Sequence, residues 1–325
     1  MGISKKILFK SLYLFSFLYS SLFADYIDVH PPQKDPWFTG PLLTPSAYTI
    51  PKGHYNIEPY LFVNNNFSFY NSDWRAKRLP ATASTINLQI QFRMGLNSFM
   101  DFTLTPSFFY NYIEDASSFR FGDLYTELSF QLTAQGGTQN QNGFSSKVYL
   151  GELFPLGAYQ HLKLDKLGTD IAGGGSFVTT FGFVFSKRWN VYSYHFLQFQ
   201  LNGNYSLFSQ VPVHGLNFYG GDRKTSGTVF PGSSFPFLCS FEYNLTQNLG
   251  LALDIVNNIA LKTKFKGKTT IPVGIRHTKY NLSLAPAIEY NYSENVGLIA
   301  GVWFSAIGRY TFSFTNYTIA LNWYV

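Results

Sequence analysis

The last eleven residues, 315–325, read T-N-Y-T-I-A-L-N-W-Y-V. Every second residue from Tyr317 to Val325 is apolar, and the opposite face has Asn316, Thr318, Asn322 and Tyr324. This is the period-2 pattern of a β-strand with one apolar face. This apolar face continues to the end of the sequence and therefore needs an apolar partner. The pattern is typical of the closing strand of an outer-membrane barrel, in which the partner is lipid.

Residues 1–24 have the features of a secretion signal peptide. A basic start with three lysines precedes an apolar stretch over residues 12–22, and Ala24 offers a small residue at the cleavage position. An uncleaved anchor is the weaker alternative, because the apolar stretch has only about half of the ~20 residues that a spanning helix needs. We therefore expect a protein exported to the bacterial cell envelope.

The composition also indicates a surface that water does not cover. Aromatic residues make up 19% of the chain and charged residues only 13%, whereas a soluble domain has about a quarter charged residues. Without the three signal lysines, 21 Lys and Arg stand against 18 Asp and Glu, a balance that gives no reason to expect nucleic acid as a partner. Cys239 is the single cysteine, so no disulfide can form within the chain.

An internal repeat defines the structural unit. Residues 241–251 read F-E-Y-N-L-T-Q-N-L-G-L and residues 288–298 read I-E-Y-N-Y-S-E-N-V-G-L, so both are expected to be hairpins with a tight polar turn. Following the alternation along the chain predicts an all-β, antiparallel transmembrane barrel over residues 54–325. Its twelve strands are expected at 54–64, 84–95, 99–110, 122–134, 144–153, 175–187, 190–207, 234–245, 249–264, 279–292, 296–308 and 315–325. The even number is typical of single-chain bacterial barrels.

The connections alternate in length. Turns near 97, 188–190, 247 and 294 are short, whereas the connections over 65–83, 111–121, 154–174, 208–233 and 265–278 are long. Outer-membrane barrels have short periplasmic turns and longer extracellular loops. The long connections are therefore predicted to lie outside the cell.

Charged residues are expected on the lumen face of the strands, because an Arg or Lys at mid-bilayer costs roughly 2 to 4 kcal/mol on the lipid face. The strand over 122–134 illustrates this, since Leu124 and Leu128 alternate with Asp123 and Glu127. Only His195 and Glu152 are expected to point outward. The predicted lumen-lining residues are Glu58, Arg93, Asp101, Asp123, Glu127, Lys147, Glu242, Asp254 and Glu289.

These residues lead to a prediction about charge. Counting Lys262 as well, seven acids face three bases, which favours cations along the wall. The alternative is an ion-paired network that stiffens the barrel without conducting, because charges in any lumen seek partners.

A run of lysines predicts a basic patch at the mouth of the barrel. Residues 262–268 read K-T-K-F-K-G-K, so alternate lysines share one face of an extending strand, the lumen face, with Phe265 opposite. The patch could attract anionic solutes or meet phosphates of lipopolysaccharide, and a solvated strand extension is the simpler alternative. Its members are Lys262, Lys264, Lys266, Lys268, Arg276 and Lys279.

Residues 25–53 form a proline-rich segment before the first strand, and we expect it to be periplasmic. Proline at this density favours extended chain of roughly 3 Å per residue, long enough to enter a barrel about 30 Å deep and plug it. The favoured alternative is a tail that packs beneath the periplasmic rim through Trp37 and Phe38.

The start of the mature chain also suggests a family. Residues 36–62 read P-W-F-T-G-P-L-L-T-P-S-A-Y-T-I-P-K-G-H-Y-N-I-E-P-Y-L-F, and hairpins of the E-Y-N-x-[ST]-x-N-x-G type follow. Together they resemble bacterial outer-membrane barrels of the MetA-pathway, phenol-degradation and transporter-like type. The resemblance implies a porin-like or solute-uptake role and provides no functional residues.

Signatures of enzymes are weak. No histidine has metal-ligand spacing with Cys, Asp or Glu, and Gly173–Gly175 lack the lysine of a phosphate loop. A phospholipase is a remote alternative, because Ser193 and His195 lie at the periplasmic end, away from the outer headgroups. We expect no cofactor, no metal and no catalysis.

The predicted function is therefore porin-like passage or uptake of small solutes in the bacterial outer membrane. Twelve strands lie between the eight that side chains fill and the sixteen to eighteen of aqueous porins, so the lumen should be narrow. A surface-exposed structural or adhesin-type barrel is the alternative. Expected partners are outer-membrane lipid, lipopolysaccharide, the barrel assembly machinery and an unidentified small solute.

Overall fold

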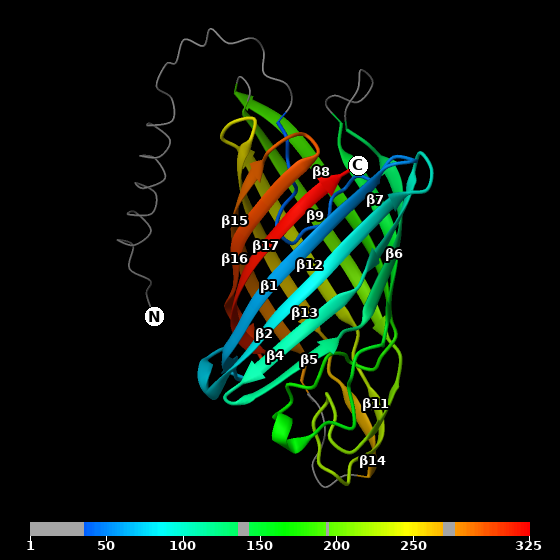
Figure 1. Ribbon diagram of the computed structural model, residues 1–325, viewed down its shortest axis with the longest axis vertical. Helices are drawn as coiled ribbons and strands as arrows, with labels where there is room; N and C mark the ends of the chain where they lie inside the picture. Colours follow the sequence, from blue (N-terminus) through cyan, green and yellow to red (C-terminus); the bar gives the residue numbers. More distant parts are fainter. Residues whose placement is uncertain (1–35, 136–142, 193–194, 269–276) are drawn as a thin grey trace, which may run out of the picture. The chain divides into compact units, whose positions relative to one another are not determined.

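The structure is a computed structural model that describes residues 36–135, 143–192, 195–268 and 277–325. The signal peptide expected at 1–24 lies outside these residues. The described chain forms an antiparallel barrel (Figure 1), in which the strands pair in the order β1-β17-β16-β15-β13-β12-β9-β8-β7-β6-β3-β2-β4-β5. An additional pairing between β1 and β2 closes the ring.

The fourteen strand segments in this order make up a wall of twelve strands, as predicted, because two wall strands are each interrupted and so consist of two segments. Both β3 and β4 pair with β2 and together form one wall strand, while β5 and β6 form the next. The first half of the wall contains β1 (Tyr55–Tyr70), β2 (Ala76–Gly95), β3 (Met100–Thr105), β4 (Ser107–Ile113), β5 (Ala116–Phe121), β6 (Leu124–Thr133) and β7 (Ser145–Phe154). The second half contains β8 (Val178–Tyr192), β9 (His195–Phe208), β12 (Ser234–Asn244), β13 (Leu249–Ala260), β15 (Lys279–Asn291), β16 (Val296–Arg309) and β17 (Phe312–Tyr324).

The two faces of the wall confirm that polar side chains point inward and apolar ones outward. In β17, Tyr317 and Ile319 are 55% and 42% exposed, whereas Asn316 and Thr318 are 4% and 3% exposed. A soluble sandwich would show the opposite arrangement, because its apolar face would be buried. Within the described residues no helix is long and apolar enough to span a membrane.

Several predicted boundaries are wrong, and most of the errors lie where strands extend past the expected membrane. β1 and β2 stay paired as far as Tyr70 and Ala76, and β4 and β5 as far as Ile113 and Ala116. The long connections expected at 65–83 and 111–121 are therefore short, because polar residues there continue the backbone ladder outside lipid. The pairing of β8 with β9 continues past the turn expected at 188–190, as far as Tyr192 and His195.

Two of the three remaining long connections, β9–β12 and β13–β15, contribute strands to a small separate sheet, which we call the loop sheet. It contains β10 (Val211–His214), β11 (Ser226–Phe230) and β14 (Lys264–Lys268), paired in that order. Val211, Val213 and Val229 are fully buried on one side of it. The strand predicted over 249–264 is therefore wrong at its end, because β13 stops at Ala260. The connection between β7 and β8 contains one short 3-10 helix, η1 (Leu164–Lys166).

Labelling of intact cells should reveal which end of the barrel faces outward. The loop sheet lies at the end opposite the C-terminus and the short turns (Figure 1). In a Cys239→Ser background, Arg223→Cys in the long connection is expected to react with an impermeant maleimide, and Ser98→Cys in a short turn is not. Labelling of Ser98→Cys alone would invert the predicted orientation.

Candidate functional site: the barrel lumen

Residues 36–50 run from the rim into the barrel, and we call them the N-terminal strap. The Asn291 side-chain amide donates to the Trp37 carbonyl at 2.6 Å, and the Asn322 amide donates to the Thr39 carbonyl at 3.1 Å. Leu42 is only 1% exposed. The favoured prediction of a tail beneath the rim is therefore wrong for residues 39–50, which lie in the lumen. Trp37 is at the rim, because its N–H donates to the Gln247 carbonyl of a short turn at 3.4 Å. Residues 25–35 lie outside the described chain.

Carboxylates of β13 and β15 hold the first half of the N-terminal strap. The backbone N–H groups of Leu43 and Thr44 donate to the two oxygens of Asp254 at 3.2 and 3.1 Å, and the Thr44 hydroxyl donates to Asp254 at 2.7 Å. The Thr39 N–H donates to Glu289 at 3.1 Å. Irregular backbone at membrane depth needs such partners, because no strand or helix satisfies it.

The second half of the N-terminal strap is held by the opposite wall. The Ile50 N–H donates to Asp101 at 2.8 Å, and Asp101 also forms an ion pair with Arg93 at 2.8 Å. Gln131 accepts from the Thr49 N–H at 2.6 Å and donates to the Ala47 carbonyl at 2.8 Å. Gln131 was not among the predicted site residues, because an uncharged amide on the inward face gave no sign of its partner.

Small residues make room for the N-terminal strap. Leu42 packs into a cluster of buried alanines with Ile299 (Ala252, Ala285, Ala287 and Ala320). A Cβ added at Gly301 would come within 2.9 Å of Leu42 Cδ2, so this position also needs glycine. These inward-facing small residues are the sequence signal that was missed, because a wall that fills its own lumen would use larger side chains there.

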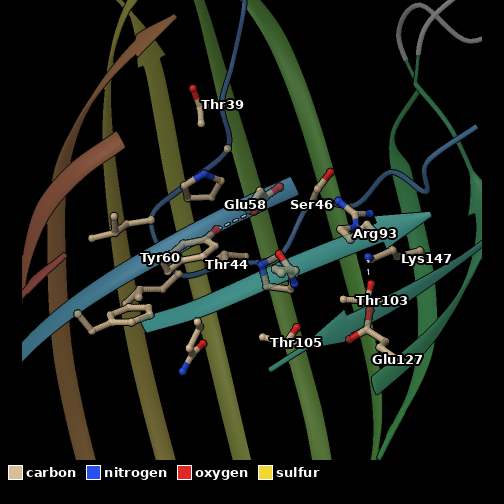
Figure 2. A pocket seen from close by; sticks show the side chains of 18 residues that line it. Thr39, Thr44, Ser46, Glu58, Tyr60, Arg93, Thr103, Thr105, Glu127 and Lys147 are labelled. Carbon is tan, nitrogen blue, oxygen red and sulfur yellow. Dashed lines mark hydrogen bonds and ion pairs between the residues drawn. The ribbon is translucent and has the colours of Figure 1, made fainter. Parts of the chain in front are cut away.

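An inner cavity of about 200 Å³ remains between the N-terminal strap and the facing wall. Figure 2 shows Lys147 next to Glu127, at an N–O distance of 3.8 Å, and Glu58 next to Tyr60, whose hydroxyl donates to it at 2.8 Å. Strap residues 39–46 form one side. The facing side is polar and includes Glu58, Tyr60, Phe62, Gln89, Gln91, Arg93, Thr103, Thr105, Glu127 and Lys147.

An outer cavity of about 630 Å³ lies toward the long connections. Asp123 lines it and accepts from the backbone N–H groups of Gly157 and Gly174 at 2.8 and 3.2 Å, which fastens the β7–β8 connection to the wall. The Tyr219 hydroxyl donates to the Gly174 carbonyl at 2.8 Å, and burial raises the pKa of this phenol. The two cavities share three lining residues, Gln89, Gln91 and Thr105, so they adjoin along the same wall.

The nine predicted lumen residues all lie on the inward face, but they have different surroundings. Glu58, Arg93, Glu127 and Lys147 line the inner cavity, and Asp123 lines the outer one. The other four are 0% exposed and line neither cavity: Asp101, Glu242, Asp254 and Glu289. The predicted count of seven acids against three bases therefore does not describe the surface that a solute would meet.

The predicted mouth patch is divided between different elements. Lys264, Lys266 and Lys268 are exposed on β14, and Phe265 packs with the valines on its other side, as expected. Lys262 is exposed in the link before β14, so it does not belong to the wall. Lys279 starts β15, and Arg276 lies outside the described residues.

Signs of catalysis are few in the part of the chain that the structure describes. No group of three or more His, Cys, Asp or Glu residues could hold a metal ion there. His195 stacks on Tyr243 of the outer face, with ring centroids 5.7 Å apart. Ser193 lies outside the described residues.

Three solved structures to which this chain is similar can be compared with its fold. An outer membrane channel from Pseudomonas putida F1 has a TM-score of 0.69 at 10% identity, with 87% of this chain and 100% of that chain covered. The translocator domain of the autotransporter NalP from Neisseria meningitidis has a TM-score of 0.42 at 10% identity, covering 83% of this chain and 87% of that chain. The NanC porin has a TM-score of 0.43 at 9% identity, with 81% of this chain and 98% of that chain covered.

In the comparisons by sequence, no protein-family model and no curated protein matches this chain. At 10% identity the first similarity establishes the fold. The chain is therefore a closed, antiparallel twelve-stranded β-barrel of the outer-membrane type.

Proposed function

We propose that this chain is a narrow channel of the bacterial outer membrane that lets small polar solutes pass. The observation that supports this most directly is the pair of adjoining polar cavities along β1, β2, β3 and β6. Hydroxyl and amide groups of Gln89, Gln91 and Thr105 lie where the cavities meet. Such groups can replace part of a solute's hydration shell, which a sealed apolar core could not do.

The inner cavity sets the size limit. Arg93 and Lys147 are 6% and 2% exposed, so the N-terminal strap leaves little free surface beside them. We expect passage of ions and of solutes with few heavy atoms, at a conductance well below that of general porins with sixteen or more strands.

Charge selectivity should be weak and should favour cations. Glu58, Glu127 and Asp123 face the two cavities, whereas Arg93 and Lys147 supply the positive charge. Arg93 is already paired with Asp101, and Lys147 lies 3.8 Å from Glu127. Among the residues that the structure describes, Glu58 is therefore the charged residue of the inner cavity that has no ion-pair partner.

Recording from purified protein in planar bilayers tests the function. Small, reproducible conductance steps are expected, and proteoliposomes should swell with small neutral solutes but not with disaccharides. The resemblance to barrels of the MetA phenol-degradation pathway stays a prediction, and including phenol in the solute panel tests it. Complete absence of conductance and swelling would contradict the proposal.

Glu58→Gln should shift the reversal potential in a salt gradient toward anions. The variant removes one cavity charge. In the wild type the two oxygens of Glu58 accept separately from the Asn56 amide at 2.6 Å and the Tyr60 hydroxyl at 2.8 Å. The glutamine oxygen can keep the bond from Asn56, and its NH2 group can donate to the Tyr60 hydroxyl, which accepts as well as donates. Asp73→Asn in the exposed β1–β2 connection is the matched control and should have no effect, since it is screened by salt over about 8 Å. An equal shift in both variants would locate selectivity outside the inner cavity.

A non-conducting structural or adhesin-type barrel is the second candidate. The observation that favours it is the N-terminal strap itself, because Leu42 and Ala47 are 1% and 0% exposed and the strap occupies one side of the lumen. We propose no enzymatic role, since the outward-facing His195 lies at the short-turn end of β9, away from the predicted outer surface.

A further inference from the structure

The loop sheet has one apolar and one basic side. Val211, Val213, Val229 and Phe265 pack on one side with Tyr159 and Tyr219. On the opposite side, Lys266 pairs with Thr228 and Lys268 pairs with Ser226, so lysines and hydroxyls alternate across two strands. We call Lys264, Lys266, Lys268, Ser226 and Thr228 the basic face.

The basic face points away from the channel. Its apolar reverse side contacts Tyr219, which donates to the Gly174 carbonyl, and the Gly174 N–H in turn donates to Asp123 of the outer cavity. The side toward the mouth is therefore the valine side. The predicted lumen orientation of these lysines is wrong, because β14 belongs to the loop sheet rather than to an extension of the wall.

The loop sheet also lies close to the membrane surface. Links of only two or three residues join it to the wall, at 209–210, 231–233 and 261–263. Such links reach at most about 13 Å, at roughly 3.3 Å per residue step. β12 and β13 have 11 and 12 residues, close to the 9 to 11 that cross the hydrocarbon layer, so their outer ends lie near the headgroups.

The chemistry along the basic face fits an interface between lipid and water. Phe230, which is 39% exposed, pairs with Lys264 at the end nearest the wall, and Lys266 and Lys268 follow farther out. The two ion pairs within the described chain are Arg93–Asp101 and Lys147–Glu127, so these lysines have no carboxylate partner there. Three free ammonium groups beside two hydroxyls match the donors that phosphate oxygens accept from.

We propose that the basic face binds the phosphate groups of an outer-leaflet glycolipid. The proposal does not depend on solute passage, since the basic face points away from both cavities. A simpler role for these lysines is to keep the edge strand β14 from pairing with other chains. That role predicts no binding of a phosphate-containing ligand, so a binding measurement distinguishes the two.

The test uses full-length protein in non-ionic detergent and titrates fluorescent lipopolysaccharide at low salt. Each lysine near an anionic lipid surface contributes about fivefold to the binding affinity. The variant with Lys264→Gln, Lys266→Gln and Lys268→Gln should therefore bind about 100-fold more weakly than the wild type. Replacing the same three lysines with Arg should preserve binding. The matched control changes Arg75, Lys77 and Arg78, all exposed near the β1–β2 connection, to Gln and should bind like the wild type.

Dephosphorylated lipopolysaccharide and inorganic polyphosphate distinguish the sources of the ligand chemistry. The proposal requires strong loss with the dephosphorylated form. Equal binding of that form, wild-type affinity of the Lys→Gln variant, or an equal loss in the control variant would overturn it. Binding of polyphosphate without lipopolysaccharide would show that the partner is a soluble polyanion instead of a lipid.

Discussion

Replacing Asp254 and Glu289 with alanine is expected to raise the single-channel conductance several-fold. The N-terminal strap would lose four hydrogen bonds, from the Thr39, Leu43 and Thr44 N–H groups and the Thr44 hydroxyl. Bonds to charged groups contribute about 1.5 kcal/mol or more each, so on the order of 6 kcal/mol of anchoring would be lost. The wall should remain closed, since its strands are held by their own backbone ladder.

Glu242→Ala is the matched control for this experiment. Glu242 is as deeply buried as Asp254 and lies on the adjacent strand. Its carboxylate accepts from the wall residues Gln198 and Gln200, at 2.7 and 2.8 Å, and adjoins the carboxyl group of Glu289 rather than the backbone of the strap. It should leave the N-terminal strap in place and the conductance low. Equal opening in both variants would mean that buried charge, and not strap anchoring, limits the current.

A reversible crosslink separates strap release from damage to the wall. The side-chain oxygens of Thr44 and Ser240 are in contact, so Thr44→Cys and Ser240→Cys in a Cys239→Ser background should form a disulfide that fixes the N-terminal strap to β12. The oxidised channel should stay narrow and the reduced one should open. Identical currents before and after reduction would show that the N-terminal strap does not control the path.

The barrel itself could be predicted from the sequence, because lipid outside and water inside force the side chains of each strand to alternate. Leu124 and Glu127 on β6 point to opposite faces because one has an even and the other an odd position in the strand. The closing strand β17 follows the same alternation. The boundaries were wrong where this constraint ends. Around Ser68 and Ser118 the strands have left the expected hydrocarbon layer, so pairing continues without an apolar face to mark it.

The content of the lumen could not be predicted in the same way. Parity places Asp254 and Glu58 on the same inward face, yet one is fully covered by the N-terminal strap and the other lines a cavity. This difference depends on contacts between residues about 200 positions apart in the sequence, such as Thr44 with Asp254. No local pattern contains that information, although the inward alanines around Leu42 indicate that something else fills the space.

The largest loss of assembly is expected from Leu88→Arg, compared with Gln89→Arg at the next position. Leu88 is 38% exposed on the outer face of β2, whereas Gln89 lines both cavities. Leu88 lies seven residues before the end of β2 at Gly95. In a strand tilted by about 45°, these seven residues rise roughly 16 Å along the membrane normal. Leu88 is therefore expected near the centre of a hydrocarbon layer ~30 Å thick. An arginine there should cost about 2 to 4 kcal/mol.

Heat-modifiability on gels and recovery from outer membranes measure the difference between these two variants. Leu88→Arg should give mostly unfolded protein, because its guanidinium replaces an apolar contact with lipid and faces Leu61 across the β1–β2 pair. Gln89→Arg should assemble normally and instead lower the conductance and weaken the preference for cations, since the charge enters the path beside Thr105. Equal folding of the two variants would mean that the register of β2, and with it the assignment of inner and outer faces, is wrong.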